Sequence, residues 1–483
     1  MLAQSNEFTN AADLIRSDIR LISGDQHVID HTELNNREYF VAQQLKKSGI
    51  LDSKKEFTVF INFNNFDWVL PVLKATWRLG GNIFVHDFHV GYTSIPEFCD
   101  FYNFVDVVVN LNLLAEKFAD KISVQLRNYD PNTTYKIADT PTDITGKTIA
   151  VKTHSSGTTG IPKIIDYDHD LVRDLTQRLI PLFELTNHDR PLHWKTLHHA
   201  SLFLNYAIPL LNVCRDHWFF SAQLLSTDRY NAQTFFQLCL PFCKEHSITR
   251  VLVPYDWITN LAEVESVDVE GKLVLHCIRG IKKNQLGTIF QKFNPKSIID
   301  IFGCSEQGVM FIKTIDQNNW QDFDPGLFDT VTPDLEYEIS KNFIRVRWPN
   351  RSWNTIGDIF QQTRKGLKYI GRSYSLVIQE EIVPLESLDR YLRTSYHDRQ
   401  YQLVADFEQN ELYLAFFDDQ ALPNLFDLNN NIARKCHPKL SIKGIRKFDI
   451  SAVNSGMKPS SPILLYAFQK GILNEESSQT KSN

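Results

Sequence analysis

Short apolar runs alternate with longer amphipathic segments along the first third of the chain. From residue 57 onward, the runs FTVFINF, NIFVHDF and VDVVVNL are rich in β-branched and aromatic residues, which favours strands. The segments between them, DWVLPVLKATWRLG and TSIPEFCDFYN, have the length of helices, and Gly80-Gly81 predicts where the first of them ends. Strands that alternate with helices in this way predict an α/β fold with a largely parallel sheet.

The alternation continues beyond residue 147 and later changes character. A predicted strand, TIAVKTH, is followed by a loop, a second strand, PKIIDY, and a helix with Leu171, Leu175 and Leu179 at intervals of four residues. After Gly366 the predicted strands and helices become shorter and more mixed. We therefore expect a large N-terminal domain at residues 1–370, a small domain at 371–475 that begins near Gly371-Arg372, and a disordered polar tail at 476–483.

Length and composition agree with this organisation. The 483 residues exceed what one hydrophobic core usually supports, and 43% hydrophobic with 22% charged residues is typical of a globular protein. The net charge of −6 provides no basic surface for a phosphodiester backbone, so nucleic acid is not an expected partner. No run reaches the ~18 apolar residues that a membrane span requires, and the first residues lack the pattern of a secretory leader, so we expect a cytoplasmic protein.

The cysteines indicate no obvious chemistry. Their number is seven, which is odd, and no Cys-x-x-Cys occurs, which argues against a disulfide framework and against a structural zinc site. Cys239 and Cys243 are four residues apart on a predicted helix and are interpreted as buried thiols.

The loop between the strands TIAVKTH and PKIIDY has the composition of a phosphate-binding loop. Glycines allow backbone N–H groups to approach an oxyanion, hydroxyls add donors, and a lysine supplies positive charge. The residues concerned are Ser155, Ser156, Gly157, Thr158, Thr159, Gly160 and Lys163. The spacing is not that of a Walker A loop, and the alternative interpretation is a surface turn, since Gly/Ser/Thr clusters often are no more than that.

The segment Ser-Gly-Thr-Thr-Gly-x-Pro-Lys resembles the phosphate loop of the adenylate-forming superfamily, which includes acyl-CoA synthetases and the adenylation domains of peptide synthetases. The resemblance implies that this loop contacts the phosphates of ATP and that Lys163 takes part in catalysis. In that family the lysine is usually followed by Gly-Val, whereas this chain has Ile164-Ile165.

Three further segments resemble the same family in the expected order. In Phe302-Gly303-Cys304-Ser305-Glu306, the resemblance implies that Phe302 lies on adenine, Ser305 reaches a phosphate, and Glu306 is a catalytic residue and Mg²⁺ ligand. In Thr355-Ile356-Gly357-Asp358, it implies that Asp358 accepts hydrogen bonds from the ribose hydroxyls. Arg372 corresponds to an arginine at the hinge between domains that reaches ribose or phosphate. Taken singly, these segments could be ordinary turns and a surface arginine.

Two candidate residues depend more heavily on the resemblance. His199, in the segment LHHASLF, corresponds to the stretch that lines the acyl pocket, but a histidine in apolar surroundings is equally well a core residue. Lys458 corresponds to the terminal catalytic lysine that bridges the substrate carboxylate and the α-phosphate, with Met457 inserted between it and Gly456. It could instead be one solvated lysine among many.

The chain departs from the family pattern after the Gly-Arg pair. Tyr374 stands where the family has an aspartate or lysine pivot, and a glycine is absent from the segment 375–386. Ile278-Arg279-Gly280 also lacks one glycine of a pair near adenine. The step after adenylation is therefore less well supported by the sequence than adenylation itself.

The resemblance implies a complete reaction scheme. A large multi-layer α/β domain and a small, mobile α+β domain would enclose Mg²⁺ and ATP, and a small carboxylic acid would attack the α-phosphorus to give an acyl adenylate and pyrophosphate. The acyl group would then pass to the thiol of CoA or of a phosphopantetheinyl carrier protein. Two alternatives stay open: a ligase that uses an amine or hydroxyl acceptor, and a nucleotide-binding protein that has lost its chemistry. No charged residue is clearly placed for an amino acid's ammonium group, which favours a fatty or aromatic acid.

Overall fold

The computed structural model describes most of the chain at the level of individual residues. The described residues are 10–53, 56–61, 66–85, 104–110, 121–136, 144–154, 164–193, 203–219, 235–254, 265–278, 281, 283–340, 343–372, 375–378, 381–406, 409, 411–448 and 461–470. The segment TSIPEFCDFYN, expected to be a helix, lies outside these ranges.

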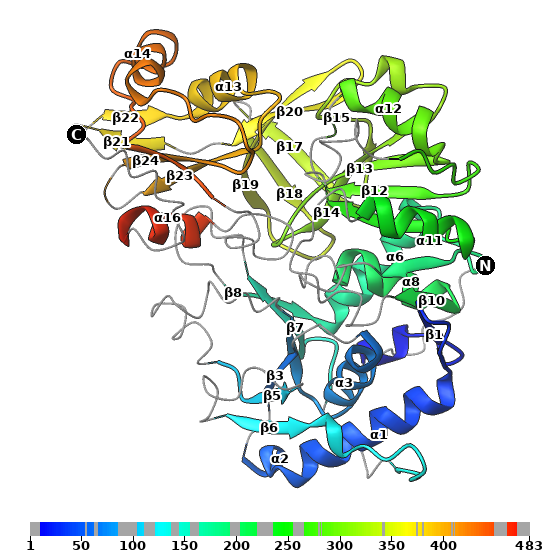
Figure 1. The fold of residues 1–483 in the computed structure, drawn as a ribbon. Helices are drawn as coiled ribbons and strands as arrows, with labels where there is room; N and C mark the ends of the chain where they lie inside the picture. Colours follow the sequence, from blue (N-terminus) through cyan, green and yellow to red (C-terminus); the bar gives the residue numbers. More distant parts are fainter. Residues whose placement is uncertain are drawn as a thin grey trace, which may run out of the picture.

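A six-stranded sheet occupies one end of the molecule (Figure 1). Its strands are parallel except for the last pair, β7 and β8, which are antiparallel. The strand order is β6(Ile122–Gln125), β5(Val107–Asn110), β3(Thr58–Ile61), β4(Asn82–Val85), β7(Ile149–His154) and β8(Ile164–Asp168). Helices α1(His31–Lys47) and α3(Phe66–Arg78) pack against each other beside it, and α2(Ile50–Ser53) follows α1. The expected α/β fold with a parallel-rich sheet is thus confirmed.

A second sheet has nine strands. Six consecutive strands are parallel, and antiparallel strands lie at both edges. The order is β16(Thr330–Val331), β14(Gly308–Ile315), β13(Ser297–Cys304), β12(Val274–Ile278), β11(Arg250–Pro254), β9(Pro191–His193), β10(Asp216–Phe219), β1(Arg20–Ser23) and β2(Val28–Ile29). The helices of this region are α6(His169–Leu182), α8(Ile208–Val213), α11(Leu240–Glu245) and α12(Lys283–Phe293).

Local sequence accounts for where several of these helices begin and end. Asp168 caps the N-terminus of α6 by accepting a hydrogen bond from the Leu171 N–H at 2.7 Å, and Leu175 and Leu179 are fully buried, as their spacing predicts. The residue Gly80, just beyond α3, has a φ of +80°, which a glycine adopts without strain and which stops the helix where the sequence predicts it.

Two helices begin with a π-helical turn that leads into a proline. The turn Phe203–Ala207 precedes Pro209 of α8, and the turn Phe235–Cys239 precedes Pro241 of α11. A proline has no N–H to donate and its ring clashes with the carbonyl four residues earlier, so a wider turn relieves the conflict. Cys239 and Cys243 lie on the second of these segments and are buried, as expected.

A third, fully antiparallel sheet follows the nine-stranded one. Its order is β15(Leu327–Phe328), β20(Gly366–Arg372), β19(Asn354–Thr363), β18(Phe343–Arg347) and β17(Glu336–Ser340). Side chains from this sheet and from β13 and β14 share one hydrophobic core, which includes Phe302, Phe311 and Phe360.

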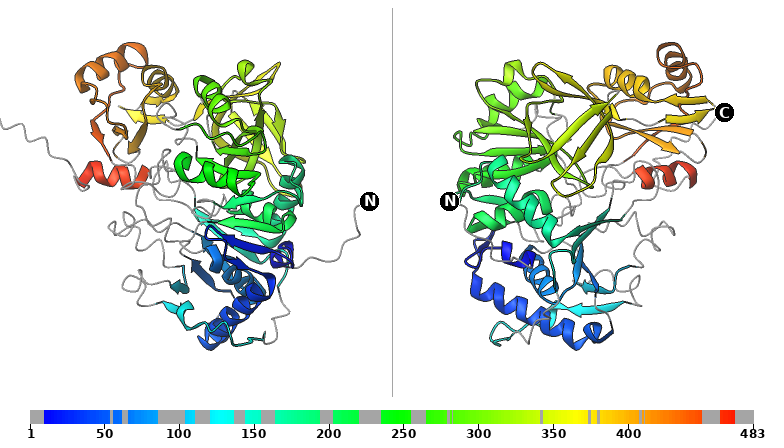
Figure 2. Two further views of the ribbon diagram at one scale, coloured as in Figure 1. Left: turned by 45° about the vertical axis from the view of Figure 1, so that its right-hand side comes forward. Right: turned by 180° about the vertical axis from the view of Figure 1, so that it is seen from behind.

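The elements after Arg372 have core clusters of their own. Two apolar clusters are built only from residues between 378 and 468. The elements are the hairpin β21(Ser375–Ile378) and β22(Glu381–Pro384), the sheet β23(Tyr401–Asp406), β24(Glu411–Phe416) and β25(Gly444–Lys447), and the helices α13(Glu386–Ser395), α14(Leu425–Lys435) and α16(Ser461–Lys470). In every view this part lies at the far end of the molecule from α1 (Figures 1 and 2). Among the helices in the described ranges, none has the length and apolar character needed to cross a bilayer.

Candidate active site

The turn that carries Ser305 and Glu306 lies at the carboxyl end of a central strand. The parallel strands β11, β12 and β13 run side by side, so their carboxyl ends meet at one edge of the nine-stranded sheet. In open α/β sheets, ligands bind at this edge. Residues 305–307 connect β13 to the antiparallel strand β14 and therefore project from it.

Two glycines and a buried asparagine define this turn. Gly303 and Gly308 are on its two sides, and Gly308 has a φ of +72°. The Gln307 N–H donates to the Cys304 carbonyl at 3.3 Å, which closes the turn. The side-chain oxygen of the buried Asn205 accepts a hydrogen bond from the Val309 N–H at 3.2 Å. The backbone of the turn is consequently held at both ends.

Glu306 is the acidic residue of this turn. Its side chain is exposed, and among the described residues it has no ion-pair partner. A carboxylate oxygen is the hard donor that Mg²⁺ prefers, but no cluster of metal-ligating side chains surrounds Glu306 among the described residues, so its role as a Mg²⁺ ligand stays a prediction. The carboxylate also lies close to Cys304: burial first, and the negative charge of Glu306 second, raise the pKa of the Cys304 thiol well above its ordinary value. Cys304 is therefore a neutral thiol.

The structure brings strand β8, which follows the predicted phosphate loop in sequence, against this turn. Strands β7 and β8 form an antiparallel hairpin in which His154 pairs with Ile164, so they hold both ends of residues 155–163. From β8, the buried hydroxyl of Tyr167 donates a hydrogen bond to the Ser305 carbonyl. Two segments about 140 residues apart are joined by this contact. Nothing in the order of the motifs alone predicts Tyr167; its only sequence signal is a phenol between the acidic residues Asp166 and Asp168.

Asp358 and Arg372 lie beside each other on the antiparallel sheet. They are paired positions of β19 and β20, and the Asp358 side chain is 6% exposed. The same two strands carry Phe360 and Tyr369, whose rings contact Phe302 at centroid distances of 4.9 and 5.4 Å. The strands with Asp358 and Arg372 therefore pack against the strand that leads to Ser305 and Glu306.

Phe302 has a packing role that the sequence does not reveal. Its ring is 6% exposed and also lies near Phe311 and Phe328, at 6.1 and 5.7 Å. An adenine needs an open ring face to stack on. In the structure the ring instead joins the nine-stranded and five-stranded sheets, and its contact with adenine stays a prediction.

Several predicted residues lie outside the described part of the chain. They are Ser155, Ser156, Gly157, Thr158, Thr159, Gly160, Lys163, His199 and Lys458. Tyr374 is outside it as well, and for Arg372 only the backbone is described. The roles of these residues stay predictions from the sequence.

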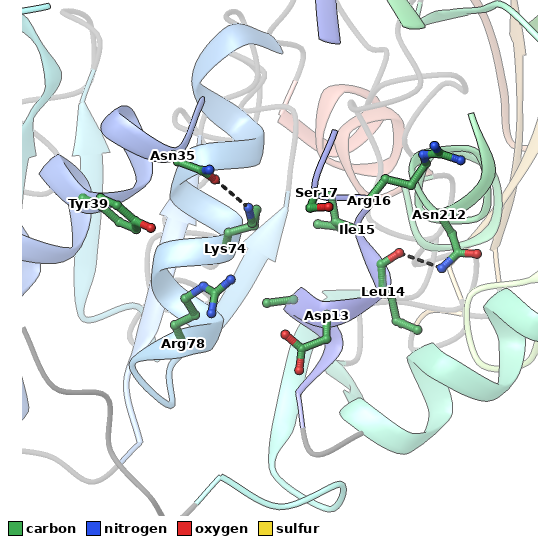
Figure 3. A pocket seen from close by; sticks show the side chains of 11 residues that line it. Asp13, Leu14, Ile15, Arg16, Ser17, Asn35, Tyr39, Lys74, Arg78 and Asn212 are labelled. Atoms are coloured by element: carbon green, nitrogen blue, oxygen red, sulfur yellow. Dashed lines mark hydrogen bonds between the residues drawn. The ribbon is translucent and has the colours of Figure 1, made fainter. Parts of the chain in front are cut away.

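A polar cavity of about 440 Å³ lies elsewhere, between α1, α3 and the residues before β1 (Figure 3). Its most prominent cations are Lys74 and Arg78 of α3, and both pair with the buried Glu38, at 2.8 and 2.5 Å. Asn35 accepts a hydrogen bond from Lys74, and Asn212 donates one to the Leu14 carbonyl. None of the described residues predicted for the nucleotide site lines this cavity, and its charges are largely paired with one another, so it is a separate feature.

Comparison with known proteins identifies the fold. No family model and no curated protein sequence matches the chain. Its fold is nevertheless that of adenylation domains and acyl-CoA synthetases, as the structures that match it show. The fold that the motif resemblance implies is thus confirmed.

Three solved structures illustrate the similarity. An A-PCP structure of McyG in complex with phenylalanyl-adenylate matches with a TM-score of 0.71 at 13% identity, covering 95% of this chain and 94% of that one. ATP-bound MatB from Rhodopseudomonas palustris matches with a TM-score of 0.68 at 14% identity, over 95% and 99%. The anthranilate CoA ligase AuaEII in complex with anthranoyl-AMP matches with a TM-score of 0.67 at 12% identity, over 96% and 98%. The chain thus spans almost the full length of each.

Proposed function

We propose that this protein binds Mg²⁺ and ATP and transfers AMP to the carboxylate of an organic acid, with release of pyrophosphate. The observation that carries the proposal is the hydrogen bond from Tyr167 to the Ser305 carbonyl, because it joins the Ser305-Glu306 turn to β8, the strand that follows residues 155–163 in sequence. The pairing of Asp358 with Arg372 supports it independently. Among proteins of the same fold, solved structures contain ATP, phenylalanyl-adenylate or anthranoyl-AMP.

The proposal assigns each residue a role. The loop 155–163 and Ser305 would bind the phosphates, Asp358 and Arg372 the ribose, and Phe302 would lie near adenine. Mg²⁺ held by Glu306 would neutralise part of the triphosphate charge. The acid's carboxylate oxygen would attack the α-phosphorus, and the bond from that phosphorus to the bridging oxygen would break, so that pyrophosphate leaves. Lys163 and Lys458 would stabilise the charge that develops on the phosphoryl oxygens.

The proposal also covers the domain division and the second step. Residues 1–370 would form the ATP- and acid-binding domain, residues 371–475 a mobile domain that delivers Lys458, and residues 476–483 a disordered tail. The separate core clusters between residues 378 and 468 support this division. The acyl group would pass to the thiol of CoA or of a phosphopantetheinyl carrier protein in the cytoplasm. His199 would contact the acid.

Pyrophosphate release is the direct test. The wild-type protein would be assayed with Mg²⁺ and ATP against a panel of fatty, aromatic and amino acids, beside Lys163→Ala and Lys458→Ala. A matched control is Lys272→Ala, because this lysine is exposed and pairs only with Glu270 among the described residues. We expect release that depends on one class of acid, falls at least about 100-fold in both variants, and is unchanged in the control.

The remaining outcomes separate the alternatives. A product that requires CoA would identify an acid-thiol ligase, whereas a product formed only with an amine or hydroxyl acceptor would identify the other ligase class. Binding of ATP without pyrophosphate release from any acid would contradict the proposed activity and indicate a nucleotide-binding protein that has lost its chemistry.

A further inference from the structure

We propose that Tyr167 and Trp348 are positioning residues that together fix the turn 305–307, and with it the Ser305 hydroxyl and the Glu306 carboxylate. The inference rests on the proposed function, because it assigns these two groups to the binding of Mg²⁺ and ATP. Neither Tyr167 nor Trp348 belongs to the motifs that identify the nucleotide site.

Two ring donors satisfy two carbonyls of the turn. The Tyr167 hydroxyl donates to the Ser305 carbonyl, and the Trp348 indole N–H donates to the Gln307 carbonyl at 3.2 Å. Both rings are buried, and Glu306, which lies between the two accepting residues, is exposed. Buried donors thus fix the carbonyls on both sides of Glu306. The backbone of the turn is held in place, so the Glu306 side chain leaves it in a defined direction.

The two donors are also tied to each other. Asp168, the residue after Tyr167, accepts from the Arg351 guanidinium at 2.9 Å through both carboxylate oxygens, and Arg351 is three residues after Trp348. Because Asp168 also caps α6, this contact anchors the loop after β18 to the end of β8. Three segments, 167–168, 305–307 and 348–351, therefore form a closed set of contacts.

Each donor is held in its own place. The Arg178 guanidinium of α6 lies over the Trp348 ring at 5.1 Å and pairs with Asp334 at 3.4 Å. Burial is the largest cause that raises the pKa of the Tyr167 phenol far above its ordinary value, and the Glu306 carboxylate acts in the same direction. Tyr167 therefore stays a hydrogen-bond donor throughout the pH range in which the protein would be assayed.

The test removes each donor in turn. Tyr167→Phe removes the hydroxyl and keeps the ring, whereas Trp348→Phe removes the indole N–H and leaves a smaller aromatic ring. Tyr129→Phe is the matched control: its hydroxyl donates to Glu33 at 2.8 Å, beside α1, and it touches no residue of the turn among the described contacts. Three quantities would be measured: amide hydrogen exchange of residues 303–309 without ligand, the Mg²⁺ concentration for half-maximal ATP binding by calorimetry, and the thermal midpoint.

We expect faster exchange of these amides in both variants and an increase of about 10-fold in the Mg²⁺ requirement, while the control matches the wild type. A merely structural role would lower the thermal midpoint but leave the Mg²⁺ requirement of the folded protein unchanged, and that result would overturn the inference. A double variant sharpens the comparison. If the two donors act through Glu306, adding Tyr167→Phe to Glu306→Gln should weaken Mg²⁺-dependent binding by less than about twofold further.

Failure of the inference is distinguishable from failure of the proposed function. Absence of pyrophosphate release by the wild type with every acid would overturn the proposed activity, while exchange and Mg²⁺-dependent ATP binding would still decide the positioning role. A wild type that binds no ATP in the presence of Mg²⁺ would overturn both.

Discussion

Asp358 of β19 and Arg372 of β20 occupy paired positions on neighbouring antiparallel strands, fourteen residues apart in sequence. The short segment between them turns back on itself, so the sequence separation of the two residues becomes direct adjacency in the sheet. Each belongs to a different motif of the proposed nucleotide site. In the proposed function, their pairing would bring these two motifs to one ribose.

Replacing Asp358 by Asn should weaken ATP binding. A carboxylate only accepts hydrogen bonds, whereas an amide presents one acceptor and a donor that faces the ribose hydroxyls unfavourably. A charge-assisted hydrogen bond contributes about 1.5–3 kcal/mol, so we expect the KM for ATP in pyrophosphate release to rise about 10- to 100-fold. The exposed Asp322, changed to Asn, is the control. An unchanged KM in Asp358→Asn would contradict the role.

The ion pair of the buried Arg250 with the partly buried Asp189 should make a large contribution to the free energy of unfolding. The guanidinium Nε lies 2.8 Å from the Asp189 carboxylate, and its other nitrogens donate to the carbonyls of Phe183 and Glu184 at 2.8 and 2.9 Å, just beyond the end of α6. Arg250→Met would leave the partly buried Asp189 carboxylate without its cation, with only the donors of Thr186 and Thr249, and should lower the free energy of unfolding in urea by about 3 kcal/mol. The double variant with Asp189→Leu should lose less than the two single losses added together. Simple additivity would show that the pair is not coupled.

The same ion pair should make the free energy of unfolding depend on pH in the acidic range. Burial alone would raise the pKa of Asp189, but hydrogen bonds and charge from Arg250, with donors from Thr186 and Thr249, bring the pKa below its ordinary value. A carboxyl group whose pKa is lowered by folding stabilises the protein above its unfolded pKa, and this contribution is lost as the pH falls toward the folded pKa. Asp189→Leu should therefore flatten the fall in unfolding free energy below about pH 4.

Two buried histidines should cause a second loss of unfolding free energy, at a higher pH than the loss from Asp189. The His193 Nε2 and His217 Nδ1 lie 2.8 Å apart, and His217 Nε2 reaches the Cys214 carbonyl at 3.1 Å, so His217 donates to the carbonyl and accepts from His193. Burial lowers the pKa of His217 to about 4. Because the unfolded chain binds the proton first, the unfolding free energy falls as the pH drops from about 6.5 toward 4.

His217→Gln is the variant that checks this. At pH 5.5 each such histidine costs about 1.4 kcal/mol relative to neutral pH, so the difference in unfolding free energy between pH 7.5 and 5.5 should shrink by about that amount in the variant. The exposed His188, changed to Gln, is the comparison. An undiminished difference in His217→Gln would show that other groups control acid unfolding in this range.

Gly308 should tolerate no side chain. Its φ of +72° is unfavourable for other residues, and a Cβ there would collide with the Asn205 side-chain oxygen, which accepts the Val309 N–H. We expect Gly308→Ala to lower the thermal midpoint and to weaken ATP binding. Gly271→Ala is a matched control, because Gly271 has a φ of +65° and open space around it. Equal losses in both variants would mean that backbone strain, at about 1–3 kcal/mol, explains the whole effect.

The strands of this protein are predicted from the sequence more completely than the residues that build its candidate active site. The β-branched runs became β3, β4, β5, β7 and β8 because alternation and burial are local signals. Asp358 and Arg372 could be proposed from the sequence because their motifs have characteristic neighbours. Tyr167 and Trp348 could not be found in this way, since a hydrogen bond to a carbonyl far along the chain depends on tertiary packing. For the same reason, the burial of Phe302 between two sheets is not visible in its motif.

The antiparallel pairing of β7 with β8 also constrains how the loop between them could be exchanged. Side chains alternate between the two faces of a strand, so a shift of β8 by one position would turn the Tyr167 phenol to the opposite face from Ser305. A loop of different length grafted between His154 and Ile164 would be compatible with the turn at 305–307 only if it returned the chain in the same register. Loop transplantation between proteins of this fold should therefore be designed from strand register rather than from loop length.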